Sequence, residues 1–138
     1  MKKEDILNYV EVIKRTCGTN DPFVIAKYFN YKICFLDTEA AFIKANSYTS
    51  TIDKSKEIVI NNGYDERSKM VLCAHEVAHC ILGHPYKNNY KDKDLKKEYE
   101  ANLFAVALLF EQADFNISFL EMPNYTLEHI LESNITDF

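Results

Sequence analysis

The chain has 138 residues, of which 47% are hydrophobic, and this length and composition predict one domain, residues 1–138, with a core of its own. The chain has 16 Lys and Arg residues against 21 Asp and Glu residues, which gives a net charge of −5. The sequence has no stripe of basic residues, and this argues against direct binding of nucleic acid. The sequence contains no run of about 18 apolar residues, the length that a membrane-spanning helix needs. Glu4, Asp5 and Glu11 lie where a signal peptide needs an uninterrupted apolar core, so we expect a cytoplasmic protein.

Two helices and a small sheet are predicted for the first half of the chain. Apolar residues at helical spacing, from Ile6 to Ile13, predict the first helix, and Pro22 suits the first turn of the second. Three β-type segments follow at 31–36, 47–52 and 57–60, with a hairpin turn at 53–56. We expect a mostly antiparallel sheet whose last strand, near 57–61, is exposed and can bind a substrate backbone by strand addition.

Helices dominate the predicted second half. A helix over 65–82 is expected to end at Gly83, an exposed polar loop follows at 86–94, and a second helix is expected over 95–112. The second helix is strongly apolar after Ala101 and must therefore be buried. A short amphipathic helix is predicted near 126–133, so the fold class is α+β.

The four cysteines show neither CxxC spacing nor the density of a secreted disulfide scaffold, and we expect them to be reduced. Cys73 and Cys80 lie on nearly one face of the predicted helix 65–82. We interpret them as small buried hydrophobic residues.

The motif H-E-x-x-H occupies residues 75–79, in the middle of the predicted helix 65–82. Residues four apart stack on one helix face, so His75 and His79 can reach one tetrahedral cation at about 2.0–2.1 Å. Glu76 lies about 100° round the helix from His75, where it can act on a metal-bound water without being a ligand. These three residue types in this spacing predict a zinc site with Glu76 as general base.

A catalytic zinc needs a third protein ligand. The positions three and six residues after His79 are Leu82 and Pro85, which excludes the Gly and His of a metzincin. His84 is expected to point away at the helix end, near the site rim, and His129 to be a surface or second-shell residue. The remaining candidates are acidic residues at the start of the helix 95–112.

Helix geometry favours Glu98 as the third ligand. Glu98 and Asn102 are four residues apart and share a face, so Asn102 can hydrogen-bond a histidine ring in the second shell. Glu100 is rotated by about 160–200° from them and is expected to face elsewhere, in a solvated charged turn.

These residues resemble the ImmA/IrrE metallopeptidases. The resemblance covers about residues 56–110 and is carried by several short motifs. They are Ile58-Val59-Ile60-Asn61, Arg67, Ala74-His75-Glu76-Val77-Ala78-His79, Leu82-Gly83-His84 and Glu98-x-x-Ala101-Asn102-x-Phe104-Ala105. The chain departs from the family after the second helix, where Leu108-Leu109-Phe110-Glu111 replaces a Leu-Leu-Met-Pro-like turn.

The resemblance implies a minimal zincin-like domain, with a small sheet packed on the H-E-x-x-H helix and a second ligand-bearing helix. It implies a gluzincin-type glutamate, which carries over onto Glu98, and cleavage of a separate helix-turn-helix repressor in a bacterial or mobile-element setting. A tyrosine is a candidate for stabilising the oxyanion, with Tyr48, Tyr64 and Tyr99 considered. The alternative is a zinc-binding regulator that binds a repressor without cleaving it.

Overall fold

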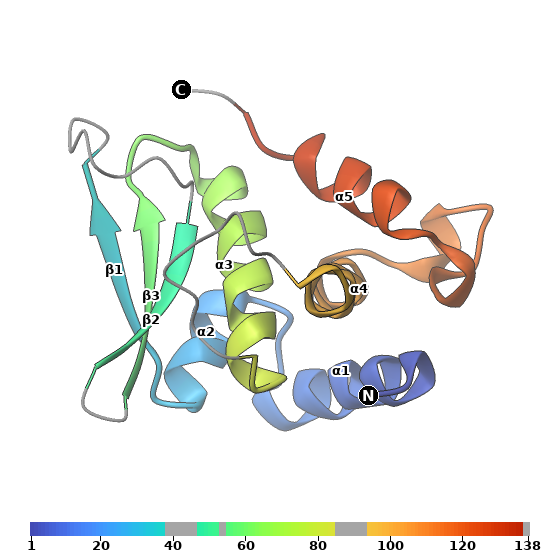
Figure 1. Ribbon diagram of the computed structural model, residues 1–138, viewed down its shortest axis with the longest axis horizontal. Coiled ribbons are helices and arrows are strands. Elements are labelled where there is room, and N and C mark those ends of the chain that lie inside the picture. Colours follow the sequence, from blue (N-terminus) through green and yellow to red (C-terminus); the bar gives the residue numbers. More distant parts are fainter. Residues whose placement is uncertain (38–46, 53–54, 85–93, 137–138) are drawn as a thin grey trace.

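The computed structural model describes residues 1–37, 47–52, 55–84 and 94–136, and for 47–52 and 55 it describes the backbone only. The described helices are α1 (Lys3–Cys17), α2 (Pro22–Tyr28), α3 (Glu66–Ile81), α4 (Leu95–Leu109) and α5 (Asn124–Glu132), and the strands are β1 (Lys32–Leu36), β2 (Ser47–Ile52) and β3 (Ser55–Asn61). The fold is therefore α+β, as predicted. Figure 1 shows the sheet on one side, α3 beside it, and α4 beyond α3 with α1 and α5 on either side.

Short polar side chains fix where the helices begin. The carboxylate of Asp65 accepts a hydrogen bond from the backbone N–H of Ser68 and caps α3, and Asp21 caps α2 in the same way. α4 ends at Leu109, three residues earlier than predicted, because Phe110 has extended backbone angles. Two 3₁₀ turns follow, Gln112–Asp114 and Phe119–Glu121, and neither was predicted.

The sheet is mixed, with strand order β1-β3-β2. β2 and β3 form the predicted antiparallel hairpin, with Ser47 opposite Ile60 and Ile52 opposite Ser55. β1 pairs with β3 in parallel, with Ile33 opposite Ile58, so the prediction of a mostly antiparallel sheet is wrong for this pair. The order of strands in the sheet departs from their order in the chain, because β3 lies between β1 and β2 and so pairs with β1.

β3 is the central strand of the sheet, which corrects a second prediction. Ile58, Val59 and Ile60 are 0%, 5% and 0% exposed, so both faces of β3 are covered, and both of its edges pair with neighbouring strands. A continuous apolar run is typical of a strand buried on both faces. β3 therefore has no edge to offer a substrate, and the outer edges of the described sheet belong to β1 and β2.

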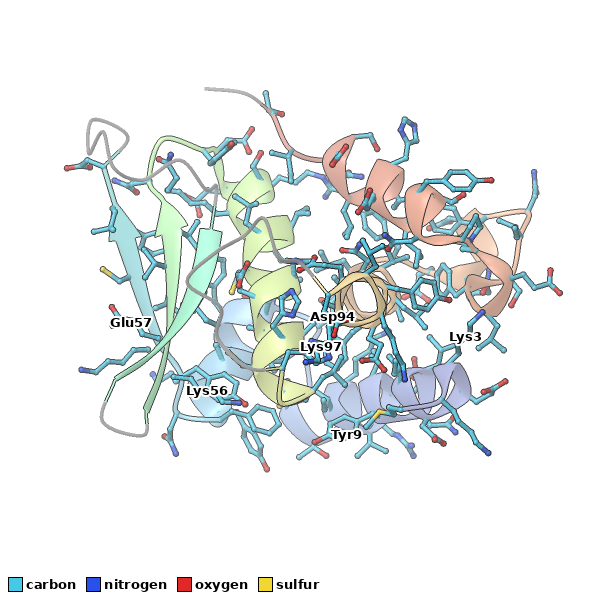
Figure 2. The ribbon with its side chains drawn as sticks, viewed as in Figure 1. Lys3, Tyr9, Lys56, Glu57, Asp94 and Lys97 are labelled. Atoms are coloured by element: carbon cyan, nitrogen blue, oxygen red, sulfur yellow. The ribbon has the colours of Figure 1, made fainter. Side chains whose placement is uncertain are left out.

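α3 is the centre of the molecule. It packs against β2, β3 and α2 on one side and against α4 on the other, so the sheet lies on the H-E-x-x-H helix as predicted. At its C-terminal end, Nζ of Lys56 donates a hydrogen bond to the carbonyl oxygen of Cys80 (Figure 2), which ties the hairpin to the last turn of the helix. The thiols of Cys73 and Cys80 are buried, as expected.

α4 is the second buried helix. A run of its residues from Ala101 to Val106 is almost fully buried against α1, α3 and α5. Among the described residues, no helix combines the length and the apolar character that crossing a membrane requires.

The burial of α4 predicts a large stability effect for a core truncation. Phe104 is 0% exposed, and Phe104→Ala should lower the free energy of unfolding by about 3–5 kcal/mol, because it removes buried apolar surface and leaves a cavity. Val12 on α1 is 52% exposed, and Val12→Ala should change that free energy by no more than about 0.5 kcal/mol. Urea unfolding of both variants measures the difference, and equal effects would contradict this description of the core.

Candidate metal centre

Three side chains from two helices converge at one point. Nε2 of His75 lies 3.3 Å from Oε2 of Glu98, and Nε2 of His79 lies 3.3 Å from Oε1 of the same carboxylate. The two Nε2 atoms are 3.1 Å apart. Among the described residues, this is the group of His, Cys, Asp and Glu side chains close enough together to hold one metal ion.

These spacings fit a tetrahedral ion. Ligand atoms about 2.0–2.1 Å from a tetrahedral zinc lie about 3.3–3.4 Å from one another. Each nitrogen lies 3.3 Å from a different oxygen of Glu98, and the two nitrogens are 3.1 Å apart, so these three contacts are close to that value. With one ligand atom taken from each residue, all three atoms lie within 4.8 Å of one another. Two imidazole nitrogens and a carboxylate also form the donor set of a catalytic zinc site that keeps its fourth position open.

α3 presents the two histidines by helical repeat alone. They are four residues apart on a helix whose other faces are held by the sheet and by α4, and their rings meet edge to face at a centroid distance of 4.6 Å. Their side chains are 23% and 15% exposed, for His75 and His79 respectively. Both side chains are therefore partly buried.

The N-terminal turn of α4 presents Glu98. The carboxylate of Asp94 accepts hydrogen bonds from the backbone N–H groups of Lys96 and Lys97, which fixes the start of the helix. Figure 2 shows Asp94 and Lys97 at this end of α4. A carboxylate in the first turn also lies at the positive end of the helix dipole, which favours its charged form.

The two histidines keep Glu98 ionised. Burial raises the pKa of its carboxyl, but hydrogen bonds and charge interactions with His75 and His79 lower it by more, so the pKa lies well below its ordinary value. The carboxylate is thus available as an anionic ligand.

Glu76 lies next to the ligand pair in sequence but is more buried than either histidine, at 7% exposed. Its position one residue after His75 turns it by about 100° round α3. Glu76 is not a member of the candidate metal group, and its role as general base stays a prediction.

Asn102 does not make the hydrogen bond that sequence reasoning predicted. Its Nδ2 atom donates to Oδ1 of Asn124 at 2.9 Å, so the side chain joins α4 to the start of α5 instead of binding a histidine ring. The physical reason is that Asn102 lies one turn beyond Glu98 along α4, where α5 also packs against that helix.

The partner of the His79 ring is His84, which was expected to point away. Nδ1 of His84 lies 2.8 Å from Nδ1 of His79, and its Nε2 lies 3.0 Å from Oε1 of Glu100. Burial lowers the pKa of His84, and contact with His79 lowers it further, while Glu100 opposes both effects.

Glu100 is buried at 9% exposed, so the prediction of a solvated turn is wrong. Its second oxygen accepts a hydrogen bond from the amino group of Met1 at 3.2 Å. Because α1 and α3 both pack against α4, a residue that faces away from Glu98 still faces protein. Leu82-Gly83-His84 was the sequence signal for this contact, since a glycine after a helix commonly turns the chain back onto its last turn.

The other candidate residues are not members of the candidate metal group. Tyr99 donates from its hydroxyl to the carbonyl oxygen of Met122, and Tyr64 is a core residue that precedes α3. The side chain of Tyr48 lies outside the described residues, as does most of the predicted loop 86–94. His129 is exposed on α5. The oxyanion-stabilising group therefore stays a prediction.

Comparisons with known proteins agree with this geometry. The family model described as the IrrE N-terminal-like domain, Peptidase_M78, matches residues 26–133. The chain is also similar to a protein of Bacillus phage phi105 named "Uncharacterized immunity region protein 2", with 30% identity over an alignment of 122 residues; the alignment covers 84% of this chain and 73% of that protein. No solved structure matches the chain significantly. The three convergent side chains all lie inside the matched region.

The convergence predicts one divalent transition-metal ion per chain. His75→Ala, His79→Ala and Glu98→Ala should each abolish binding or weaken it severely, because each removes one of three ligands. His129→Ala is the matched control and should bind like the wild type. Equilibrium dialysis with zinc and with cobalt, read by metal analysis, measures the stoichiometry, and full loading of any of the three ligand variants would exclude that residue from the site.

Proposed function

The chain belongs to the IrrE N-terminal-like domain family of peptidases, Peptidase_M78, and from this premise we propose that it is a zinc-dependent endopeptidase that cleaves a separate helix-turn-helix repressor. The observation that carries the proposal is the convergence of His75, His79 and Glu98 at the spacing of a tetrahedral zinc. Family membership supports peptide-bond hydrolysis, and the donor set supports zinc. Together they favour a zincin-like catalytic domain.

Each residue has a defined task in this proposal. His75, His79 and Glu98 hold the ion. Zinc, when bound, supplies a Lewis acid that lowers the pKa of a water to about 7 and polarises the scissile carbonyl. Glu76 takes one proton from the attacking water as its oxygen bonds to the carbonyl carbon, and it gives that proton to the leaving amine as the C–N bond breaks.

The described sheet offers the substrate one edge next to the metal helix. β2 packs against α3, and its outer edge has no partner strand among the described residues, whereas β1 lies on the other side of β3. An extended peptide can add to such an edge through backbone hydrogen bonds. We therefore propose that the substrate backbone pairs with the outer edge of β2 and not with β3.

The proposed setting is a phage or mobile-element regulatory module. The similar protein of Bacillus phage phi105 is named for an immunity region, which supports a link to repressor control. Because a repressor acts on DNA in the cytoplasm, a peptidase that cuts it would act there too. The net charge of −5 does not favour direct binding of this chain to DNA. The proposed partner is therefore the repressor protein and not its operator DNA.

Glu76→Gln tests the proposal, with a helix-turn-helix repressor from the same genome as substrate. The variant should retain zinc and the thermal unfolding of the wild type, yet lose cleavage by at least about 10²-fold, the scale of general-base catalysis. Glu66→Gln is the matched control in the same helix, because the Glu66 side chain is 93% exposed, and it should cleave normally. Fragments are identified by mass spectrometry, with and without chelator.

One result would reject cleavage as the mechanism, and another would reject only the role of Glu76. Zinc-loaded wild type that leaves the repressor intact but releases it from its operator would support the regulator that only binds. Equal cleavage by Glu76→Gln would exclude Glu76 as the base.

A further inference from the structure

We propose that His84 and Glu100 are positioning residues, which hold the ring of His79 in the tautomer and orientation that a metal requires. The proposal rests on the proposed function, because it assigns these residues to the zinc site. The feature that carries it is a continuous hydrogen-bonded chain from a ligand histidine to a buried carboxylate.

The chain is short and enclosed. Nδ1 of His79 and Nδ1 of His84 are 2.8 Å apart, and Nε2 of His84 is 3.0 Å from Oε1 of Glu100. The side chains of His84 and Glu100 are 7% and 11% exposed. Both contacts have the length of good hydrogen bonds, and there is little water to compete for them.

Metal binding by His79 leaves one arrangement of protons along this chain. Nε2 of His79 faces the convergent point and must offer its lone pair to the ion, so the ring proton lies on Nδ1. Nδ1 of His84 must then accept a hydrogen bond from Nδ1–H of His79, so the ring proton of His84 lies on Nε2, which donates a hydrogen bond to Glu100. The carboxylate thereby selects the tautomer of His84, which in turn selects that of His79.

The backbone builds this chain with one glycine. Gly83 has φ +73°, in the left-handed region that glycine adopts readily, and it turns the chain back at the end of α3. The backbone N–H of His84 then donates to the carbonyl oxygen of His79 at 3.0 Å, the long-range bond of a Schellman motif. Backbone and imidazole of His84 therefore both bind His79.

Outer partners of ligand histidines orient the ring and raise its basicity, and their removal typically costs about 10–100-fold in metal affinity. In most such sites a carboxylate or carbonyl contacts the ligand ring directly. Here His84 lies between the ligand ring of His79 on α3 and the carboxylate of Glu100 on α4. In this proposal α4 therefore supplies both the ligand Glu98 and the carboxylate that orients His79.

The first experiment compares zinc affinities by competition with a chromophoric chelator. Glu100→Met removes the acceptor while keeping a long side chain, and it should raise the Kd for zinc by about 10–100-fold. Glu100→Gln keeps an oxygen that can accept from His84 and should restore most of the affinity. Lys96→Met is the control, since Lys96 is exposed on the same helix, and it should leave the Kd unchanged.

The second measurement needs no variant. Long-range ¹H–¹⁵N NMR of the zinc-loaded wild type should find His79 protonated at Nδ1 and His84 protonated at Nε2. If the role of Glu100 were purely structural, Glu100→Met would lower the thermal stability of the protein but leave its Kd for zinc equal to that of the wild type.

The outcomes separate this proposal from the one on which it rests. If the wild type and Glu100→Met bind zinc equally well, the positioning role is wrong but the zinc site stands. The same holds if the wild type binds zinc and His84 carries its proton on Nδ1. Wild type that binds no zinc would overturn both proposals. The proposal is supported if Glu100→Met binds zinc more weakly than the wild type, Glu100→Gln recovers most of the affinity, and the wild type shows the expected tautomers.

Discussion

The contact between the first turn of α4 and the last turns of α3 is the constraint on which the site depends. His75 and His79 come from one helix and need only its 3.6-residue repeat, but Glu98 reaches them only if a second helix begins at the right point. The Asp94 cap fixes that beginning, and the apolar residues from Ala101 onward bury the rest of α4. The sheet and α2 hold α3 from the other side, so the hydrophobic core fixes the spacing of the polar atoms at its edge.

The partly buried carboxylates of Glu98 and Glu100 would destabilise the fold if they had no partners. Glu98 lies between two imidazoles, and Glu100 is bound by His84 and by the amino group of Met1. A buried carboxylate without such partners would lose more through desolvation than packing returns. His75, His79 and Glu98 also come close enough together to hold a metal ion.

The buried thiols lie outside the candidate metal group, which among the described residues consists of His75, His79 and Glu98. Cys73 lies in the same helix as the ligands, and burial raises the pKa of its thiol well above the ordinary value, with nearby acidic groups adding to the effect. Metals bind the thiolate, so a thiol that stays protonated is a poor ligand at neutral pH. The site is consequently one of nitrogen and oxygen donors.

Local patterns predicted much of this structure. The H-E-x-x-H spacing gave the histidine pair, and hydrophobic periodicity together with capping residues gave every α-helix within a few residues. What failed were the predictions about how elements meet. The parallel pairing of β1 with β3 depends on strand order, which no local pattern encodes.

The errors at the site have the same cause. Glu100 was expected in solvent because it faces away from Glu98, but α4 has neighbours on several sides, so facing away from one of them does not mean exposure. Asn102 was assigned to a histidine by the i+4 rule, yet it binds Asn124, because α5 packs against α4 at that turn. Helix geometry predicts the direction of a side chain and leaves its partner undetermined.

The central claim is that two histidines and one glutamate, and no cysteine, bind the metal. X-ray absorption at the zinc edge of the loaded protein tests it most directly. The account predicts four nitrogen and oxygen neighbours at about 2.0–2.1 Å, with the outer-ring signals of two imidazoles. A sulfur neighbour at about 2.3 Å, or the signal of a single imidazole, would contradict it.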